Sequence, residues 1–282
     1  MAQAARDLLV LIQRSPVHVA AHDRQAWLDL FAEDAVVEDP VGSPAVHKRD
    51  GTLAGFWDTF IAPNQVRFEV LADYVDGDDV MRDVVIHTVM AGGIAIQVPA
   101  YLLYETRDHG GTRRLGRLAA HWTLKHSGRQ VRGMGARAWR PMTAVVVRIA
   151  RKLGPTWLYA YFASQWNGVG LRGVRAVEAL ARAVSARDAD ALRGLFVAEG
   201  AELQLGGVRA TPATLLSHLP AGSRLSVEAP ISAGWTTACR FRIDGPTPSS
   251  GLALFETAPK TQRLCRARFF AAAAAPADVT PV

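Results

Sequence analysis

The sequence repeats one plan twice, and this internal repeat constrains the fold more than any other feature. The segment RDADALRGLF (187–196) echoes HDRQAWLDLF (22–31). Farther along, GLALFETAPKTQRLCRARFF (251–270) echoes PAYLLYETRDHGGTRRLGRLAAHW (99–122), and each is typical of a strand, a polar turn and a strand that ends in an aromatic residue. A duplicated α+β unit of about 110 to 125 residues per copy explains these echoes and lies within the usual domain size.

We therefore expect one domain over 1–127, a basic and aromatic helical linker over 128–173, and a second domain over 174–282. The 282 residues are 49% hydrophobic and 21% charged, which is enough apolar material for two cores. The chain has only two cysteines, so a disulfide scaffold and a cysteine-based zinc site are excluded. The first residues do not form a signal peptide pattern, and we expect a cytoplasmic protein.

The first unit begins with a helix over 23–31, for which Asp23 is a plausible N-cap. A strand at 36–37 and a second helix over 51–60 come next. Four strands are then expected near 66–74, 80–90, 94–105 and 114–125.

The string VVEDPVG (36–42) places an acid where a buried strand ends in a turn. Proline fixes φ, donates no hydrogen bond to a neighbouring strand and restricts the residue before it, so Asp39 marks the strand end. A turn aspartate commonly binds nearby backbone amides, and a strand end is also a usual place for a catalytic base.

The run WLDLFAEDAVVEDPVGSPAVHKRDGTLAGFWDTF (27–60), followed by four strands that close at AAHW (119–122), resembles the ketosteroid isomerases. These belong to the nuclear transport factor 2-like (SnoaL-like) superfamily of cone-shaped α+β domains with a deep apolar pocket. The resemblance covers about residues 15–125. It implies two such domains in tandem, with a degenerate second copy that covers the sheet of the first in place of a partner subunit.

The resemblance also implies a function for Asp39. By its position in the motif, Asp39 matches the general base that moves a proton between two carbons beside a ketone. Burial in an apolar cone raises the pKa of a carboxyl group and suits it to that task. We expect a steroid or another apolar polycyclic ketone as substrate, an intramolecular isomerase as the activity, and neither a cofactor nor a metal.

Two departures from the family pattern concern the donors that stabilise the oxyanion. The family's tyrosine position falls near Ser15, beside Pro16, which is expected to break the first helix. The family's protonated aspartate position falls near Ala100. Strand parity suggests that Asp83 faces the pocket and donates as a neutral acid, the alternative being an acid at the surface or linked to Arg82.

The same parity predicts the pocket wall, and ordinary core packing is the alternative for its aromatic members. The expected wall residues are Phe31, Trp57, Val85, Val98, Ala100, Leu102, Leu118 and Trp122.

Two other functions remain open at this level. Related domains in polyether biosynthesis open epoxides with paired acids, and Asp39 with Asp83 is a candidate pair. Alternatively, the chain is a non-catalytic carrier of an apolar ligand, which the missing oxyanion donors favour and the intact VEDPVG string opposes.

The segment 137–173 combines cations and aromatic residues, and the chain has no acid between His109 and Val177. It is too interrupted to span a membrane. Packing between domains or subunits is one interpretation, and peripheral contact with an anionic membrane is the other. We expect no nucleic-acid partner, because the second half of the segment is too apolar to follow phosphates. The chain is expected to be a monomer with a pseudo-dimeric domain pair, or a homodimer.

Overall fold

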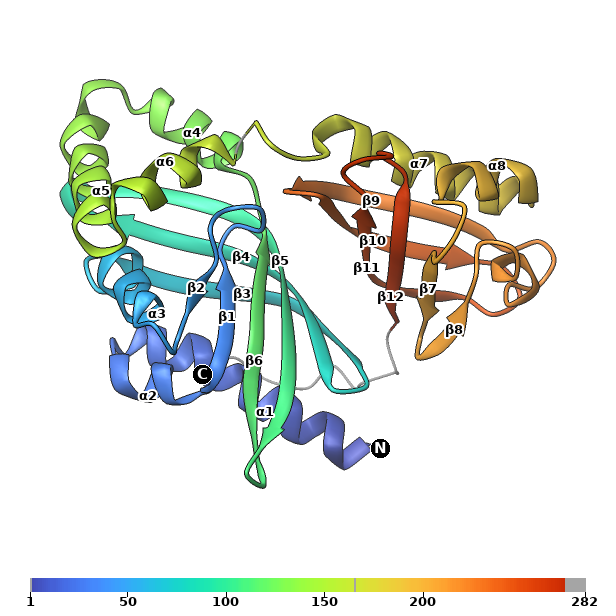
Figure 1. Ribbon diagram of the computed structural model, residues 1–282, viewed down its shortest axis with the longest axis horizontal. Coiled ribbons are helices and arrows are strands. Elements are labelled where there is room, and N and C mark those ends of the chain that lie inside the picture. Colours follow the sequence, from blue (N-terminus) through green and yellow to red (C-terminus); the bar gives the residue numbers. More distant parts are fainter. Residues whose placement is uncertain (1, 165, 272–282) are drawn as a thin grey trace.

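A computed structural model describes residues 2–164 and 166–271 and shows two α+β domains side by side (Figure 1). The helices of the first domain precede and follow its first strand: α1 (Ala2–Ala20), α2 (Arg24–Asp29), α3 (Thr52–Phe56) and the π-helical turn η1 (Trp57–Ile61). Its strands are β1 (Phe31–Glu38), β2 (Val46–His47), β3 (Gln65–Asp76), β4 (Asp79–Met90), β5 (Ile94–His109) and β6 (Thr112–His121). A short 3-10 turn, η2 (Ala91–Gly93), joins β4 to β5.

These strands form one mixed sheet in the order β2-β1-β6-β5-β4-β3. All neighbours are antiparallel except β1 and β6, which run parallel, so the end of β1 lies beside the end of β6. This parallel pairing brings Asp39, just after β1, close to Trp122, just after β6.

The second domain repeats this sheet with the order β8-β7-β12-β11-β10-β9 and a parallel β7–β12 pair. Its elements are α7 (Gly170–Ala186), α8 (Ala189–Leu195), β7 (Glu202–Leu205), β8 (Val208–Ala210), η4 (Leu215–Ser217), β9 (Arg224–Ala233), β10 (Thr236–Asp244), β11 (Ser249–Thr257) and β12 (Leu264–Ala271). Both six-stranded sheets therefore have the same topology, which confirms the expected fold class of two tandem α+β cones.

The repeat extends to the turn that starts the second helix of each copy. His22 and Arg187 both adopt left-handed backbone, each with φ of 54°. The aspartate that follows, Asp23 or Asp188, caps the helix by accepting a hydrogen bond from the backbone N–H three residues later. The predicted cap at Asp23 is confirmed.

Helix α1 continues through Pro16, so the predicted break in this helix is wrong. Leu8, Ile12 and Val19 lie on both sides of the proline and are buried against the sheet. Their burial offsets the roughly 3 kcal/mol that an interior proline costs a helix.

The outer faces of the two sheets pack against each other through an apolar layer. From the first domain this layer includes Met81, Tyr101 and Leu103; its other members include Ala238, Leu252, Leu254 and Phe270. Gly42 and Gly234 meet at one end of the contact, where a Cβ on Gly234 would lie 2.8 Å from the Gly42 Cα atom. The second domain thus covers the sheet of the first.

The segment between the domains folds into helices that lie over the first domain rather than between the two sheets (Figure 1). They are α4 (Leu124–Gly133), the 3-10 turn η3 (Gly135–Ala138), α5 (Trp139–Lys152) and α6 (Pro155–Ala163). In the described part of the chain no helix is long and apolar enough to cross a membrane.

Candidate active site

The first domain encloses a cavity of about 490 Å³ between its sheet and the helices α4, α5 and α6. This volume is within the range of sites for small molecules. The sheet contributes mainly aliphatic side chains, whereas the helices around the cavity add aromatic rings such as Phe56, Phe60 and Trp27. A site of this kind suits a ligand that is largely apolar.

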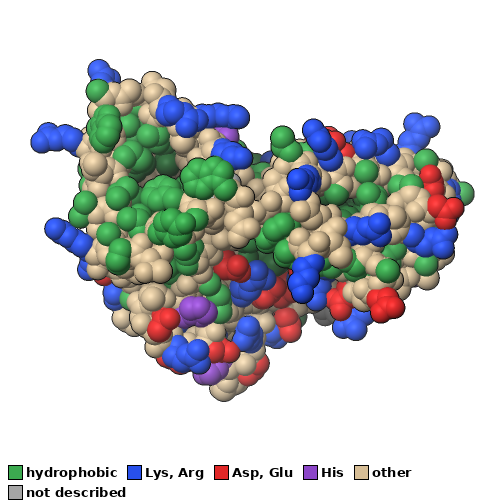
Figure 2. Space-filling view, turned by 45° about the horizontal axis from the view of Figure 1, so that its top comes forward, with side chains coloured by type: hydrophobic (Ala, Val, Ile, Leu, Met, Phe, Trp, Pro, Cys, Tyr) green, Lys and Arg blue, Asp and Glu red, His purple; other side chains and the backbone are tan. Residues whose placement is uncertain are grey.

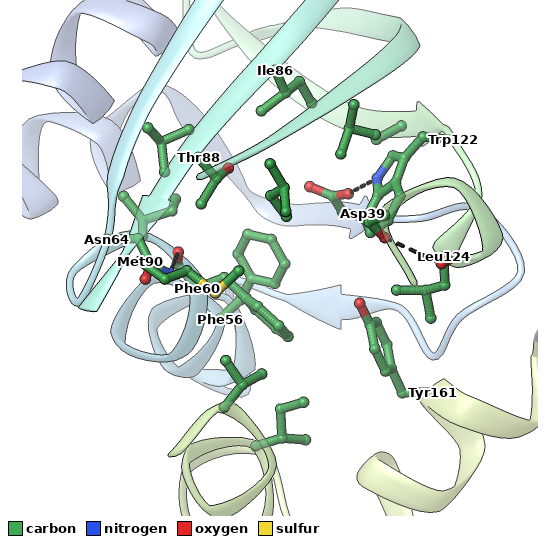
Figure 3. A pocket seen from close by; sticks show the side chains of 18 of the residues that line it. Asp39, Phe56, Phe60, Asn64, Ile86, Thr88, Met90, Trp122, Leu124 and Tyr161 are labelled. Atoms are coloured by element: carbon green, nitrogen blue, oxygen red, sulfur yellow. Dashed lines mark hydrogen bonds between the residues drawn. The ribbon is translucent and has the colours of Figure 1, made fainter. Parts of the chain in front are cut away.

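Asp39 is the one carboxylate among the described residues that line this cavity. The backbone N–H of Val41 donates to the Ala120 carbonyl at 2.8 Å and fixes the loop that follows Asp39 against β6. The Trp122 indole N–H donates to an Asp39 carboxylate oxygen (Figure 3). Burial raises the pKa of Asp39 to about 6, although the Trp122 hydrogen bond acts in the opposite direction.

Ser15, Tyr104 and Tyr161 are among the hydroxyl-bearing residues that line the cavity with Asp39. Ser15 accepts a hydrogen bond from the Trp27 indole at 3.1 Å, and its own hydroxyl donates toward the Tyr104 oxygen. Burial raises the pKa of Tyr104 to about 12, and it raises the pKa of Tyr161 as well, with a further contribution from the nearby Asp39 charge. Both tyrosines therefore stay protonated near neutral pH and remain hydrogen-bond donors.

Tyr161 reaches the cavity from α6, which lies outside the repeated unit. Its ring stacks on Trp157 at 5.0 Å and contacts Phe60 at 5.9 Å between ring centroids. Figure 3 shows the tyrosine on the same side of the cavity as Asp39 and Trp122. The helical segment between the domains thus supplies a polar group to the site of the first domain.

The opposite end of the cavity has a second, weaker polar region. Asn64 and Thr88 line it, across the cavity from Asp39 (Figure 3). The Asn64 amide donates to the Phe60 carbonyl at 2.8 Å, and its side-chain oxygen has no hydrogen-bond partner among the described residues. The cavity is apolar between these two ends.

Comparison with known proteins identifies this first domain. Residues 12–133 match the family model of the SnoaL-like domain. These residues form a SnoaL-like domain. The search of curated proteins found no match.

Several solved structures are similar to part of the chain. A Δ5-3-ketosteroid isomerase from Mycobacterium sp. is 28% identical over 42% of this chain and 95% of its own, with a TM-score of 0.39. A Mycobacterium tuberculosis protein in complex with estradiol-17β-hemisuccinate is 27% identical over 42% and 95% of the two chains, with a TM-score of 0.38. An epoxide hydrolase/cyclase-like enzyme of pyran ring formation in salinomycin is 16% identical over 43% and 95%, with a TM-score of 0.39.

Half of the predicted wall residues line the cavity of the SnoaL-like domain: Val98, Leu102, Leu118 and Trp122. Phe31, Trp57 and Ala100 are instead buried in the core next to it, which is the alternative considered for the aromatic residues. Val85 lies on the other face of β4, because its neighbours Val84 and Ile86 are the ones that pack in the inner core. Its predicted place in the wall is wrong.

Asp83 does not face the cavity, so that part of the prediction is also wrong. Its carboxylate accepts hydrogen bonds from Arg240 of the second domain, at 2.5 and 3.1 Å. The parity error arises at the pairing of β4 with β5, where Val84, not Asp83, stands opposite the inward-facing Ala100. Asp83 belongs to the contact between domains.

No pattern in the sequence indicated which groups close the cavity on its helical side. Ser127, Val131, Met142, Ile149 and Tyr161 all line it from the segment between the domains. The mixture of apolar and basic residues in this segment indicated helices but not what they cover. Among the described residues, no three histidine, cysteine, aspartate or glutamate side chains are grouped as metal ligands.

Proposed function

We propose that this chain moves a proton between two carbons beside a ketone in an apolar polycyclic substrate, with Asp39 as the general base. The observation that carries the proposal is the buried Asp39 carboxyl group, whose pKa is raised to about 6 in an apolar cavity. A base with a pKa near the working pH is deprotonated and still basic enough to take a carbon-bound proton.

The proposed reaction has two proton transfers. Asp39 removes a proton from the carbon next to the ketone, and the electrons of that C–H bond move into a dienolate. The neutral Asp39 carboxylic acid then returns the proton to the far carbon of the dienolate, and the double bond comes into conjugation with the restored ketone. No atom is gained or lost.

The dienolate oxygen needs a hydrogen-bond donor while it carries negative charge. Ala100 has no polar side chain to offer. We propose that Tyr161 supplies this donor, because it is protonated, lines the cavity and lies on the same side as Asp39. Ser15, Thr88, Tyr104 and Ser127 are the other hydroxyl-bearing side chains among the described residues that line the same cavity.

The proposal is tested with a Δ5-3-ketosteroid, whose isomerisation to the conjugated Δ4 product is followed by ultraviolet absorbance. Asp39→Asn is expected to lower kcat by about 10²–10⁴-fold, the usual contribution of a general base. Wild-type turnover is expected to decline below about pH 6 as Asp39 becomes protonated. Asp83→Asn is the matched control and should keep its turnover, because Asp83 lies outside the cavity.

The same assay tests the donor. Tyr161→Phe is expected to lower kcat by about 10²-fold or more with little change in KM, since the lost hydrogen bond acts on the oxyanion. Unchanged turnover in Asp39→Asn would contradict the proposal as a whole. Turnover that is lost in Asp39→Asn but kept in Tyr161→Phe would contradict only the assignment of the donor.

The two other functions make different predictions. Epoxide opening by paired acids would need a second acid beside Asp39. Asp83 does not supply it, because it is bound to Arg240 on the other face of the sheet. A carrier would bind the steroid equally well with Asp39→Asn and would show no turnover in either form. Binding without turnover in the wild type therefore supports the carrier and contradicts the isomerase.

A further inference from the structure

The outer face of helices α5 and α6 exposes an unusual amount of apolar surface. Trp139 is 72% exposed, Tyr159 76% and Trp166 81%. Trp139 and Val146 are seven residues apart on α5 and share one side of that helix. Val146 then lines a surface groove together with Pro155, Leu158, Tyr159, Phe162, Ala163 and Trp166. We call these groove residues and Trp139 the roof face.

The same helices bury other residues on their opposite side, so the roof face is a second apolar side and not the side that packs on the domain. Ile149 of α5 and Tyr161 of α6 are buried and turn toward the cavity. Figure 2 shows several hydrophobic side chains gathered on this part of the surface, with cations around them. The helices therefore carry apolar residues on two sides, and the described residues cover only the inner side.

Most of the exposed cations on α4 and α5 have no acidic partner among the described residues. The chain has no acid between His109 and Val177, and the exposed cations on the helices from α4 to α5 include Lys125, Arg129, Arg132, Arg137, Arg140, Arg151 and Lys152. Within the described structure, only Lys152 of these forms an ion pair, with Asp58. The arginines in this set therefore form no ion pair among the described residues. Their charge remains available for an anionic partner.

The roof face is also continuous with the cavity. Phe162 and Trp166 line both the surface groove and the cavity of the SnoaL-like domain. Through these two side chains the surface groove adjoins the cavity that holds Asp39.

We propose that the roof face docks on a lipid bilayer that contains anionic lipids. Exposed tryptophan and tyrosine rings suit the boundary between headgroups and acyl chains, and unpaired arginines and lysines attract the anionic headgroups. A nucleic acid would require the cations to follow a line of phosphates, whereas here an apolar groove lies among them. Docking requires no catalysis, so this proposal stands apart from the isomerase reaction.

The test is sedimentation of the full chain with phosphatidylcholine vesicles, with and without phosphatidylglycerol. The wild type is expected to bind the vesicles that contain phosphatidylglycerol, and added salt should weaken this binding. The variant with Trp139→Ser and Tyr159→Ser is expected to bind at least tenfold more weakly. Val208→Ser, an equally polar change at an exposed position on β8 of the second domain, is the matched control and should bind like the wild type.

Neither Trp139 nor Tyr159 lines the cavity, so turnover of a steroid in vesicle-free buffer should be unchanged in the double variant. This separates a failure of docking from a failure of the proposed reaction. Docking is refuted if the wild type does not bind vesicles with phosphatidylglycerol, if it binds both kinds equally, or if the double variant binds as well as the wild type. If the wild type is a dimer, the double variant is a monomer and neither binds vesicles, the roof face is instead a contact between two copies of the chain.

Discussion

Asp39 has opposite effects on activity and on stability. Its pKa is raised from 3.8 to about 6 in the folded protein because burial disfavours the charged form. Below pH 3.8 the carboxyl group is neutral in both the folded and the unfolded chain, so it has no such effect on stability. As the pH rises from 3.8 to about 6, the unfolded chain ionises this group while the folded protein still holds the proton, so stability is lost across this range and does not fall further above it.

We therefore expect Asp39→Asn to stabilise the protein at pH 8 by up to about 3 kcal/mol, the equivalent of the pKa difference. The asparagine oxygen retains an acceptor for the Trp122 indole, so the change mainly removes the buried charge. Near pH 4 the gain should be much smaller. Free energies of unfolding from denaturant titrations at both pH values measure this, with the exposed Asp34→Asn as the control. An equal gain at both pH values would show that ionisation is not the cause.

How far the sequence predicts the site depends on how each residue is positioned. Asp39 was accessible to prediction because a strand that ends in Asp-Pro fixes its place locally. Asp83 was not, because one residue of error in strand pairing exchanges the two faces of a sheet. Tyr161 belongs to a helix whose packing on the cavity depends on contacts such as that with Phe60, and nothing in the local pattern encodes them.

Pairs of charged and polar groups border the apolar contact between the two sheets. Asp83 binds Arg240, Asp79 binds Arg268 at 2.6 Å, and Asp76 accepts from Gln204 at 2.6 Å. In each pair the acid comes from the first domain. Such a row selects the register between the sheets, because a shift along the strands would leave buried acids without partners.

Arg240→Met is expected to destabilise the protein by about 3 kcal/mol, since it leaves the buried Asp83 carboxylate without its partner. The side chain of Asp83 is only 8% exposed, so water cannot replace the arginine fully. Adding Asp83→Leu should restore much of the loss, because the charge is then absent. The free energy of unfolding measures both effects.

Arg242→Met is the control for this substitution. Arg242 lies two residues along β10 and pairs with Asp244 at the exposed surface, where an ion pair contributes less than about 1 kcal/mol. If Arg240→Met costs no more than Arg242→Met, the contact between Asp83 and Arg240 does not hold the domains together.

The internal repeat made the two-domain architecture predictable, because two similar series of helices and strands imply two similar sheets. The core of the second copy includes several aromatic side chains.

Phe269 contacts Phe241 and Phe255 edge to face in the core of the second domain, with ring centroids 5.1 and 5.6 Å apart. The segment after β7 there has Gly206 and Gly207 in place of an acid and a proline.

The sequence left the relative placement of the two sheets open, although covering the first sheet was the expected role of the second domain. The covering has a clear energetic consequence. Met81, Tyr101 and Leu103 are at most 2% exposed in the full chain, and all three lie on the face of the first sheet that the second domain covers. Without that domain they would form an exposed apolar patch of the kind that drives association.

A fragment of residues 1–163, which keeps the SnoaL-like domain and its roof helices, is therefore expected to self-associate through this face. Light scattering after size-exclusion chromatography is expected to show dimers or larger species of this fragment. The same fragment with Met81→Ser and Leu103→Ser should be more monomeric at the same concentration. The uncovered acids, including Asp83, would then be solvated and should limit the association to this apolar centre. A stably folded, monomeric fragment would contradict the view that the second domain acts as a built-in partner for the first.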